Sequence, residues 1–141
     1  RLCRLGLPGM KERGWGRIIN VLNTAAKAPR GGSAPTAVTR AAGMALTKVL
    51  AGEGAPHNVL VNALCTGIIE SQQWVRRHQN LAPDTPLDDF LANMAVERGV
   101  PLGRLGTAEE YANMACFLAS DAGSYITGTA INVDGGLSPV V

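Results

Sequence analysis

The chain has 141 residues, 46% of them hydrophobic and 17% charged, with a formal net charge of +2. This composition predicts one domain with a packed core and excludes a disordered chain. The basic residues are scattered, which gives no electrostatic footprint for nucleic acid. No segment approaches the ~20 apolar residues of a membrane span. The chain also has no signal-peptide pattern and no Cys/His spacing typical of zinc, so we expect a cytoplasmic protein without a metal site.

The first expected elements are a helix over residues 1–13, which Pro8 and Gly9 interrupt, and a strand from Gly16 to Leu22. The strand is predicted to be buried because it is an apolar run bounded by turn residues. The Gly- and Pro-rich stretch 24–35 then predicts a loop.

A helix is expected next from Ala37 to Glu53, where helix formers predominate. Leu46, Val49 and Leu50 share an apolar face of this helix, which predicts that the face packs on the core. A second buried strand is expected from His57 to Cys65.

The stretch 68–106 is long and mixed in character, and it predicts one or two helices before a Pro- and Gly-rich exit. Connections of this length are usually functional or mobile. Trp74, Phe90 and Met94 lie within it. These side chains could line an apolar pocket, but packing inside the core of these helices is the simpler interpretation.

Thr107 begins the next expected helix, which ends near Ser120, and Glu110 completes a capping box with it. A third strand is expected from Gly128 to Gly136. Strands that alternate with helices and are apolar throughout predict an α/β fold with a parallel sheet covered on both faces. Three strands make a small sheet of this kind, so we expect a further strand beside the first one.

The chain has three widely spaced cysteines, and two of them, Cys65 and Cys116, lie in apolar sequence contexts. These two are predicted to be buried core thiols. A reducing compartment is therefore expected.

Several stretches together resemble the second half of a short-chain dehydrogenase/reductase. They are GRIINV, AGMALTKVLAGE, NVLVNALCTGIIES and, most specifically, PLGRLGTAEEYANMACFLASDAGSYITGTAINVDGG. The resemblance implies a Rossmann-type, doubly wound parallel sheet, present here as its C-terminal part, strands five to seven, in one domain over residues 1–141. Residues 68–106 correspond to the family's substrate lid.

The family places a glycine-rich phosphate loop after its first strand, because pyrophosphate must approach backbone N–H groups at a helix N-terminus. Gly31 and Gly32 precede the wrong helix for this role. The resemblance therefore predicts that the phosphate-binding half lies outside this chain, and the choice between NAD and NADP stays open.

The family's catalytic serine, tyrosine and lysine are all replaced. The resemblance places Asn23 at the serine position, Thr36 thirteen residues later at the tyrosine position, and Arg40 four residues further at the lysine position. An aliphatic hydroxyl such as that of Thr36 is far less acidic than a phenol, whose pKa is ~10. Arg40 could hold ribose hydroxyls but stays protonated, while the Asn23 amide can orient a carbonyl. These replacements preserve binding better than catalysis.

Simpler interpretations of the same residues remain open. Thr36 could cap a helix, Arg40 could pair with a carboxylate, and Asn23 could cap a strand end. Lys27 is the only nearby replacement for the proton donor that could titrate, but an exposed lysine is the simpler interpretation of it.

The resemblance also places a cofactor loop after the second strand, where Thr66 and Gly67 stand in place of the family's Pro-Gly. In the family the backbone at the Ile69 position meets the nicotinamide carboxamide, and Ser71 takes the place of a contacting threonine. The resemblance thus implies cofactor binding by Arg40, Thr66, Gly67, Ile69 and Ser71.

The sequence leaves three hypotheses. The first is an oxidoreductase that uses NAD or NADP on a small carbonyl compound or secondary alcohol and forms a homodimer or homotetramer. The second is a catalytically silent binding or assembly module. The third is a truncated gene product, whose open strand edge would make it poorly soluble.

Overall fold

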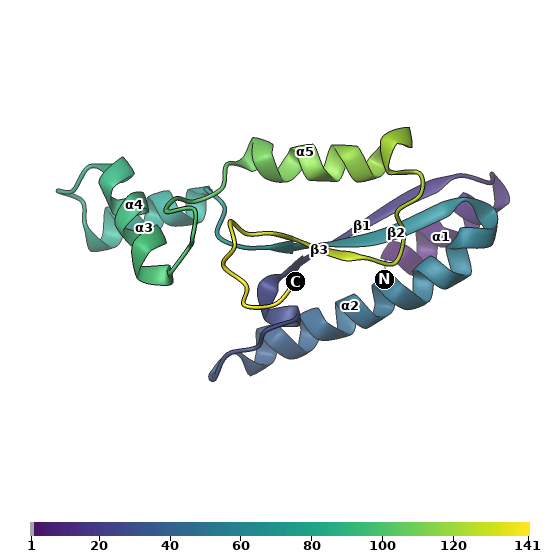
Figure 1. The fold of residues 1–141 in the computed structure, drawn as a ribbon, viewed down its shortest axis with the longest axis horizontal. Helices are drawn as coiled ribbons and strands as arrows, with labels where there is room; N and C mark the ends of the chain where they lie inside the picture. Colours follow the sequence, from purple (N-terminus) through teal and green to yellow (C-terminus); the bar gives the residue numbers. More distant parts are fainter. Residues whose placement is uncertain (1) are drawn as a thin grey trace.

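The computed structural model describes residues 2–141, and a three-stranded parallel sheet lies at its centre (Figure 1). The strands are β1 (Gly16–Asn23), β2 (Val59–Thr66) and β3 (Ala130–Val133), in the order β1-β2-β3. Each strand is joined to the next by at least one helix, as parallel neighbours require. The α/β class and the parallel sheet are therefore confirmed.

Helices cover both faces of the sheet. The helices α1 (Leu2–Glu12) and α2 (Ala34–Gly54) lie against one face, and α5 (Ala108–Ala119) lies against the other (Figure 1). This two-sided cover is the doubly wound arrangement that the apolar strands predicted.

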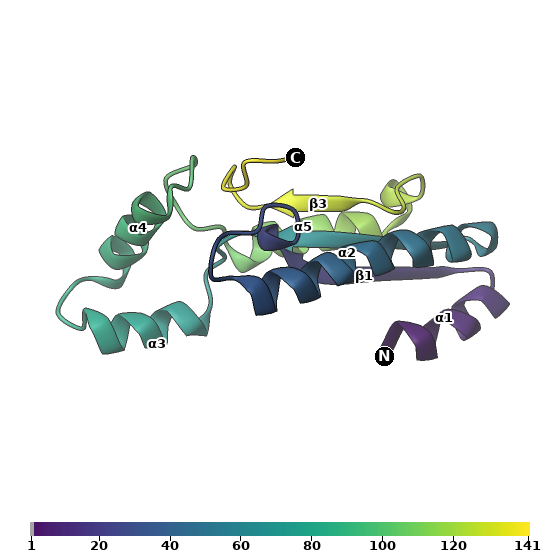
Figure 2. The ribbon, with the colours of Figure 1, turned by 90° about the horizontal axis from the view of Figure 1, so that it is seen from below.

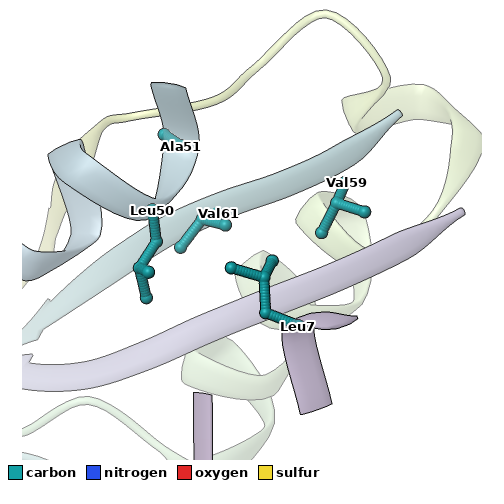
Figure 3. Packing of buried hydrophobic residues seen from close by; sticks show 5 residues of the cluster. All are labelled: Leu7, Leu50, Ala51, Val59 and Val61. Atoms are coloured by element: carbon teal, nitrogen blue, oxygen red, sulfur yellow. The ribbon is translucent and has the colours of Figure 1, made fainter. Parts of the chain in front are cut away.

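The central strand β2 forms the core. All but its last residue are buried. Val59 and Val61 pack against Leu7 from α1 and against Leu50 and Ala51 from α2 (Figure 3). Full burial of a valine or leucine side chain contributes about 1.5–3 kcal/mol relative to exposure. This layer therefore fixes α1 and α2 on their face of the sheet.

A buried amide ties β2 to the segment that leads into β3. Asn62 is 2% exposed. Its Nδ2 donates to the Ile126 carbonyl at 2.8 Å, and its Oδ1 accepts from both the N–H and the hydroxyl of Thr129. Because every polar atom of this side chain has a partner, its burial carries little penalty.

Several element boundaries differ from those predicted. Pro8 lies inside α1 without interrupting it. The residues one turn apart at positions 4 and 8 are both exposed, so water can solvate the carbonyl that the proline leaves unpaired. The helix α2 begins at Ala34, earlier than expected, because Pro35 fits the first helical turn.

On α2 only Leu50 of the three predicted core residues is buried, since Leu46 and Val49 are 45% and 57% exposed. His57 does not start a strand. It ends a short 3-10 turn, and Asn58 follows it in a left-handed conformation with φ of 56°. This reversal of the chain direction delays the start of β2.

The third strand is shorter than expected, because Gly128 precedes it with a φ of 72°. Cys65 is buried as predicted, but the prediction for Cys116 is wrong, since that thiol is exposed. The helix α5 turns Leu118 into the protein, and this phase leaves Cys116 on its outer side.

The 68–106 segment contains two helices, α3 (Gln72–Leu81) and α4 (Leu87–Arg98), which project beyond the carboxyl ends of the strands (Figures 1 and 2). Met94 is buried in a cluster of this segment, and Trp74 packs against that cluster, as predicted. Phe90 instead lies against the His78 ring, with centroids 5.3 Å apart.

Over residues 2–141, no helix is long and apolar enough to cross a membrane. In that same range no group of three or more His, Cys, Asp or Glu side chains is arranged to hold a metal ion.

Candidate functional site

The carboxyl ends of β1 and β2 place two polar side chains next to each other. Asn23 and Thr66 are register partners in the parallel ladder. The Asn23 Oδ1 and Thr66 Oγ1 atoms are both buried and have no hydrogen-bond partner among the described residues. Unpaired buried acceptors are uncommon and call for an explanation, and the carboxyl edge of a parallel sheet is where α/β proteins bind ligands. The Asn23 side chain also makes no capping bond to the 3-10 turn that follows it at Thr24–Ala26.

The loop after β2, residues 66–71 (the β2 loop), requires a glycine at its second position. The Gly67 N–H donates to the Val133 carbonyl at 3.0 Å. A Cβ atom on Gly67 would lie 2.5 Å from the Cα and Cβ atoms of Asp134. The glycine therefore lets the β2 loop pass directly against the end of β3.

The middle of the β2 loop is held by a short parallel bridge to Gly106. The Gly106 N–H donates to the Ile68 carbonyl at 3.0 Å, and the Glu70 N–H donates to the Gly106 carbonyl at 2.8 Å. The Trp74 indole N–H donates to the Ile69 carbonyl at 2.9 Å. Within residues 2–141 the Ile69 N–H makes no hydrogen bond, so it is available to a ligand.

Ser71 precedes α3 as its N-cap residue, but its side chain makes no capping bond. The Ser71 side chain is exposed. Its hydroxyl is therefore a second available polar group on the β2 loop, two residues from Ile69.

The start of α2 carries Thr36, the residue at the expected position of the proton donor. Thr36 lies in the first turn of the helix and is exposed. It is not the N-cap residue, which is Ser33, so the capping interpretation is wrong. The Thr36 carbonyl accepts from the Thr39 hydroxyl at 3.0 Å.

Arg40 contacts the strand that carries Asn23. Its Nη1 donates to the Val21 carbonyl at 2.9 Å, and no carboxylate of residues 2–141 pairs with it. The guanidinium is therefore placed beside the end of β1, two residues before Asn23. Four of its five N–H donors remain free for a ligand.

Lys27 is not the exposed lysine that the sequence suggested. It is partly buried, and its Nζ donates to the Ala130 carbonyl at 2.6 Å. Burial raises the pKa of the nearby Cys65 thiol, and the positive charge of Lys27 opposes this shift. This position of Lys27 was not predictable from the sequence, because it depends on the loop after β1 folding back toward β3.

Two hollows adjoin the β2 loop. One, of about 340 Å³, lies between this loop, Gly106 and the end of β3. The other, of about 190 Å³, is lined by Thr24, Ala25, Ala28, Arg30, Ser33, Ile68, Arg98, Leu137, Ser138 and Pro139. Ile68 lines both hollows. Sequence reasoning did not identify Arg30 or Arg98, because 68 positions separate them and only the fold brings both to one hollow.

The start of α5 is fixed by the predicted capping box. The Thr107 hydroxyl accepts from the Glu110 N–H at 3.2 Å, and the Glu110 carboxylate accepts from the Thr107 N–H at 2.9 Å. Arg104 also donates to both carboxylate oxygens of Glu110 at 2.8 and 2.6 Å. The hydrogen bonds from Arg104 and Thr107 lower the pKa of Glu110 to about 2. These bonds fix the segment next to Gly106, and so the anchor of the β2 loop.

Comparison with known proteins finds one matching family. A family model described as enoyl-(acyl carrier protein) reductase matches residues 1–138. An NADPH-dependent reductase of Bacillus subtilis (strain 168) is 35% identical over 127 residues, which are 90% of this chain and 49% of that protein.

Solved structures give the same result. An NADPH-bound short-chain oxidoreductase of Pseudomonas aeruginosa PAO1, described as containing an atypical catalytic center, superimposes with a TM-score of 0.88 at 35% identity and covers 99% of this chain and 52% of its own. The L-sorbose reductase of Gluconobacter frateurii, solved with NADPH and L-sorbose, gives a TM-score of 0.89 at 34% identity, with 99% and 54% covered. The chain thus spans about half the length of the relatives that it matches.

Proposed function

The chain belongs to the short-chain dehydrogenase/reductase family, and from this premise we propose that it forms the nicotinamide and substrate side of an NAD(P)-dependent oxidoreductase. The proposed substrate is a small carbonyl compound or a secondary alcohol. The observation that carries the proposal is the β2 loop, which is held against β3 and Gly106 while the Ile69 N–H stays free.

The polar groups at this edge fit a nicotinamide carboxamide. That group has one acceptor oxygen and two N–H donors. The Ile69 N–H can donate to the oxygen, and the unpaired Thr66 Oγ1 can accept from an N–H. When bound, such a cofactor supplies or accepts a hydride at the substrate carbon. The remaining free donors of Arg40 suit the ribose hydroxyls.

The substrate oxygen is assigned to Asn23. Its Oδ1 has no hydrogen-bond partner among residues 2–141, and its amide N–H groups can donate to a carbonyl oxygen and so orient it. Thr36 is a weak proton donor, because no environment of this exposed hydroxyl brings its acidity near that of a phenol. Arg40 keeps its charge but cannot relay protons. We therefore expect proton transfer to limit the rate, while binding is retained.

The relatives support this proposal in two ways. The B. subtilis reductase depends on NADPH. The P. aeruginosa protein is an oxidoreductase that binds NADPH although its catalytic center is described as atypical. An atypical catalytic center is therefore compatible with NADPH binding in a relative of this chain.

A second function, a catalytically silent assembly module, is favoured by a different observation. Val38, Leu46 and Val49 on α2 are 67%, 45% and 57% exposed. Apolar side chains at this density on one helix suit a contact between subunits. In this alternative α2 packs on its mate in a homo-oligomer, and the altered site carries out no chemistry.

Turnover separates the two functions. The full-length gene product would be mixed with NADPH or NADH and a panel of ketones and aldehydes, and the loss of reduced nicotinamide would be followed by absorbance. The oxidoreductase proposal predicts a slow loss that requires the carbonyl compound and saturates with it. Cofactor binding and oligomer formation without any turnover would instead support the silent module.

A further inference from the structure

The smaller hollow beside the β2 loop is positively charged. Arg30 and Arg98 both line it, and no acidic residue does. Its other polar lining groups are the hydroxyls of Thr24, Ser33 and Ser138. Two guanidinium groups in a lining whose other polar side chains are neutral favour a negatively charged occupant.

Neither of these two arginines is neutralised by the protein. Over residues 2–141 the ion pairs are Lys11 with Glu53 and Arg104 with Glu110. The guanidinium groups of Arg30 and Arg98 make no hydrogen bond or ion pair within this range. Arg104, by comparison, is fully engaged by the two carboxylate oxygens of Glu110. The charges at the hollow are thus free for a ligand.

Two stretches of the lining of this hollow are held in place. The Ser33 hydroxyl donates to the Arg30 carbonyl at 2.6 Å and accepts from the Arg30 N–H at 3.2 Å, which fixes the backbone of that loop. Ser138 also lines the hollow, and its N–H donates to the Asp134 carboxylate at 2.7 Å. A binding site needs such support, because a preformed wall reduces the cost of ordering it on binding.

Arg98 has an alternative structural role, which the test must distinguish from a role in ligand binding. It lies in the last turn of α4, where a cation complements the helix dipole. It also lines a separate hollow between α3 and α4, together with Glu97. Arg30 has neither feature, because it lies in the loop between β1 and α2.

The hollow lies where a substrate would be expected. Thr24 directly follows Asn23, and Ile68 directly precedes the free N–H of Ile69. A molecule in the hollow is therefore next to the residues assigned to the substrate oxygen and to the nicotinamide.

We infer that the substrate carries an oxyanion, either a carboxylate or a phosphate, which Arg30 and Arg98 bind together at this hollow. The inference rests on the proposed oxidoreductase function for the identity of the site. It narrows the substrate class to small anionic carbonyl compounds, such as oxo acids or phosphorylated ketones. Arginine suits both oxyanions, because its planar N–H groups match two oxygens of either group at once.

The test compares matched charged and neutral ligands. The isotope-labelled full-length gene product would be titrated at low salt with pyruvate and levulinate against their methyl esters, and with dihydroxyacetone phosphate against dihydroxyacetone. Binding would be followed by the NMR signals of the arginine Nε–H groups. We expect saturable shifts of the Arg30 and Arg98 signals with the anions alone. The member of the panel that binds distinguishes a carboxylate from a phosphate.

Variants assign the effect to the two side chains. Arg30→Gln and Arg98→Gln should each weaken binding about tenfold or more, because a charge-assisted bond is lost. Arg76→Gln is the matched control, since it removes a charge from α3 away from this hollow, and it should leave the affinity unchanged. A change with Arg98→Gln in stability but not in affinity would assign that residue to the helix dipole and overturn the inference.

The other possible outcomes show whether the oxyanion inference fails, the oxidoreductase proposal fails, or both do. Equal binding of anion and neutral partner, or no binding of either, overturns the inference whatever the turnover assays give. If the full-length product oxidises NADPH with neutral ketones as well as with oxo acids, the oxidoreductase proposal stands and this inference fails. If the anions bind through both arginines but nothing is turned over, the oxyanion site stands and the oxidoreductase proposal fails.

Discussion

The two sides of the candidate site differ in how firmly the protein holds them. The β2 loop is bonded to Val133, to Gly106 and, through Trp74, to α3, and its glycine leaves no room for a side chain. The start of α2 places Thr36 in the exposed first turn of the helix, and its hydroxyl makes no hydrogen bond within residues 2–141. The β2 loop, which is the proposed cofactor-binding side, is therefore preorganised. The start of α2, which is the proposed proton-transfer side, offers no acid of suitable strength.

The largest expected effect comes from restoring the family residues on the weaker side. The double change Thr36→Tyr with Arg40→Lys provides a phenol and a lysine that can lower its pKa. General acid catalysis typically contributes 10²–10⁴-fold, so we expect kcat to rise about 100-fold or more in the full-length product. Steady-state rates of NADPH oxidation measure this effect.

A displaced phenol is the control for that change. Thr39→Tyr with Arg40→Lys carries the same side chains, but the tyrosine lies three residues along α2. It should leave kcat near the starting value. Equal rates from both double variants, or no gain from either, would contradict the assignment of Thr36 to the position of the proton donor.

The next effect concerns the firmly held side. In Gly67→Ala the added Cβ would lie 2.5 Å from Asp134 backbone and side-chain atoms, so the β2 loop must shift. Overpacking of this kind costs about 1–3 kcal/mol. Urea unfolding would measure the loss, and nicotinamide binding should weaken with it.

Gly31→Ala is the matched control, because nothing lies within 4 Å of a Cβ at that position. Its effect should stay within about 0.5 kcal/mol, as for most surface substitutions. If Gly67→Ala were as harmless as Gly31→Ala, the close contact between the β2 loop and β3 would not exist in solution.

The smallest expected effect concerns the anchor of the β2 loop. The pKa of Glu110 is about 2, below its ordinary value of 4.5. The ionised carboxylate is favoured in the folded chain, so it stabilises the fold at pH values above about 4.5. This contribution is lost as the pH falls through about 2. Glu110→Gln should therefore lower stability near pH 7 and have little effect near pH 2.

Unfolding by urea at several pH values would follow this difference. Glu109→Gln is the control, because it removes a charge from the same end of α5 without touching Arg104 or Thr107. A penalty for Glu110→Gln that persists unchanged at pH 2 would rule out the ionised carboxylate as its cause.

The fold was predictable from the sequence where local chemistry and burial agree. The continuous apolar run around Val61 predicted a strand buried on both faces, and Thr107 with Glu110 predicted the start of α5. The position of Cys116 was not predictable, because an apolar neighbourhood does not fix which side of a helix faces the core. The early start of α2 depended on how Pro35 is used, and a proline can open a helix or precede one.

The candidate site also has a part that was predictable from the sequence and a part that was not. A loop follows the second strand as predicted, whereas its role in cofactor binding and the roles of Asn23, Thr36 and Arg40 stay predictions. The position of Lys27 and the pairing of Arg30 with Arg98 depend on the path of two loops over the sheet edge. No local pattern in the sequence encodes such a path, so only the folded chain brings these charges together.

The account depends most on whether the β2 loop binds nicotinamide, and a titration of the full-length product with NADPH, followed by nicotinamide fluorescence, tests this directly. The Ser71 side chain makes no capping bond to α3, so Ser71→Ala should leave stability unchanged and weaken NADPH binding about fivefold through the loss of one hydrogen bond. Saturable binding that weakens in this variant is the predicted result. Absence of binding, or equal affinity in both proteins, would contradict the account.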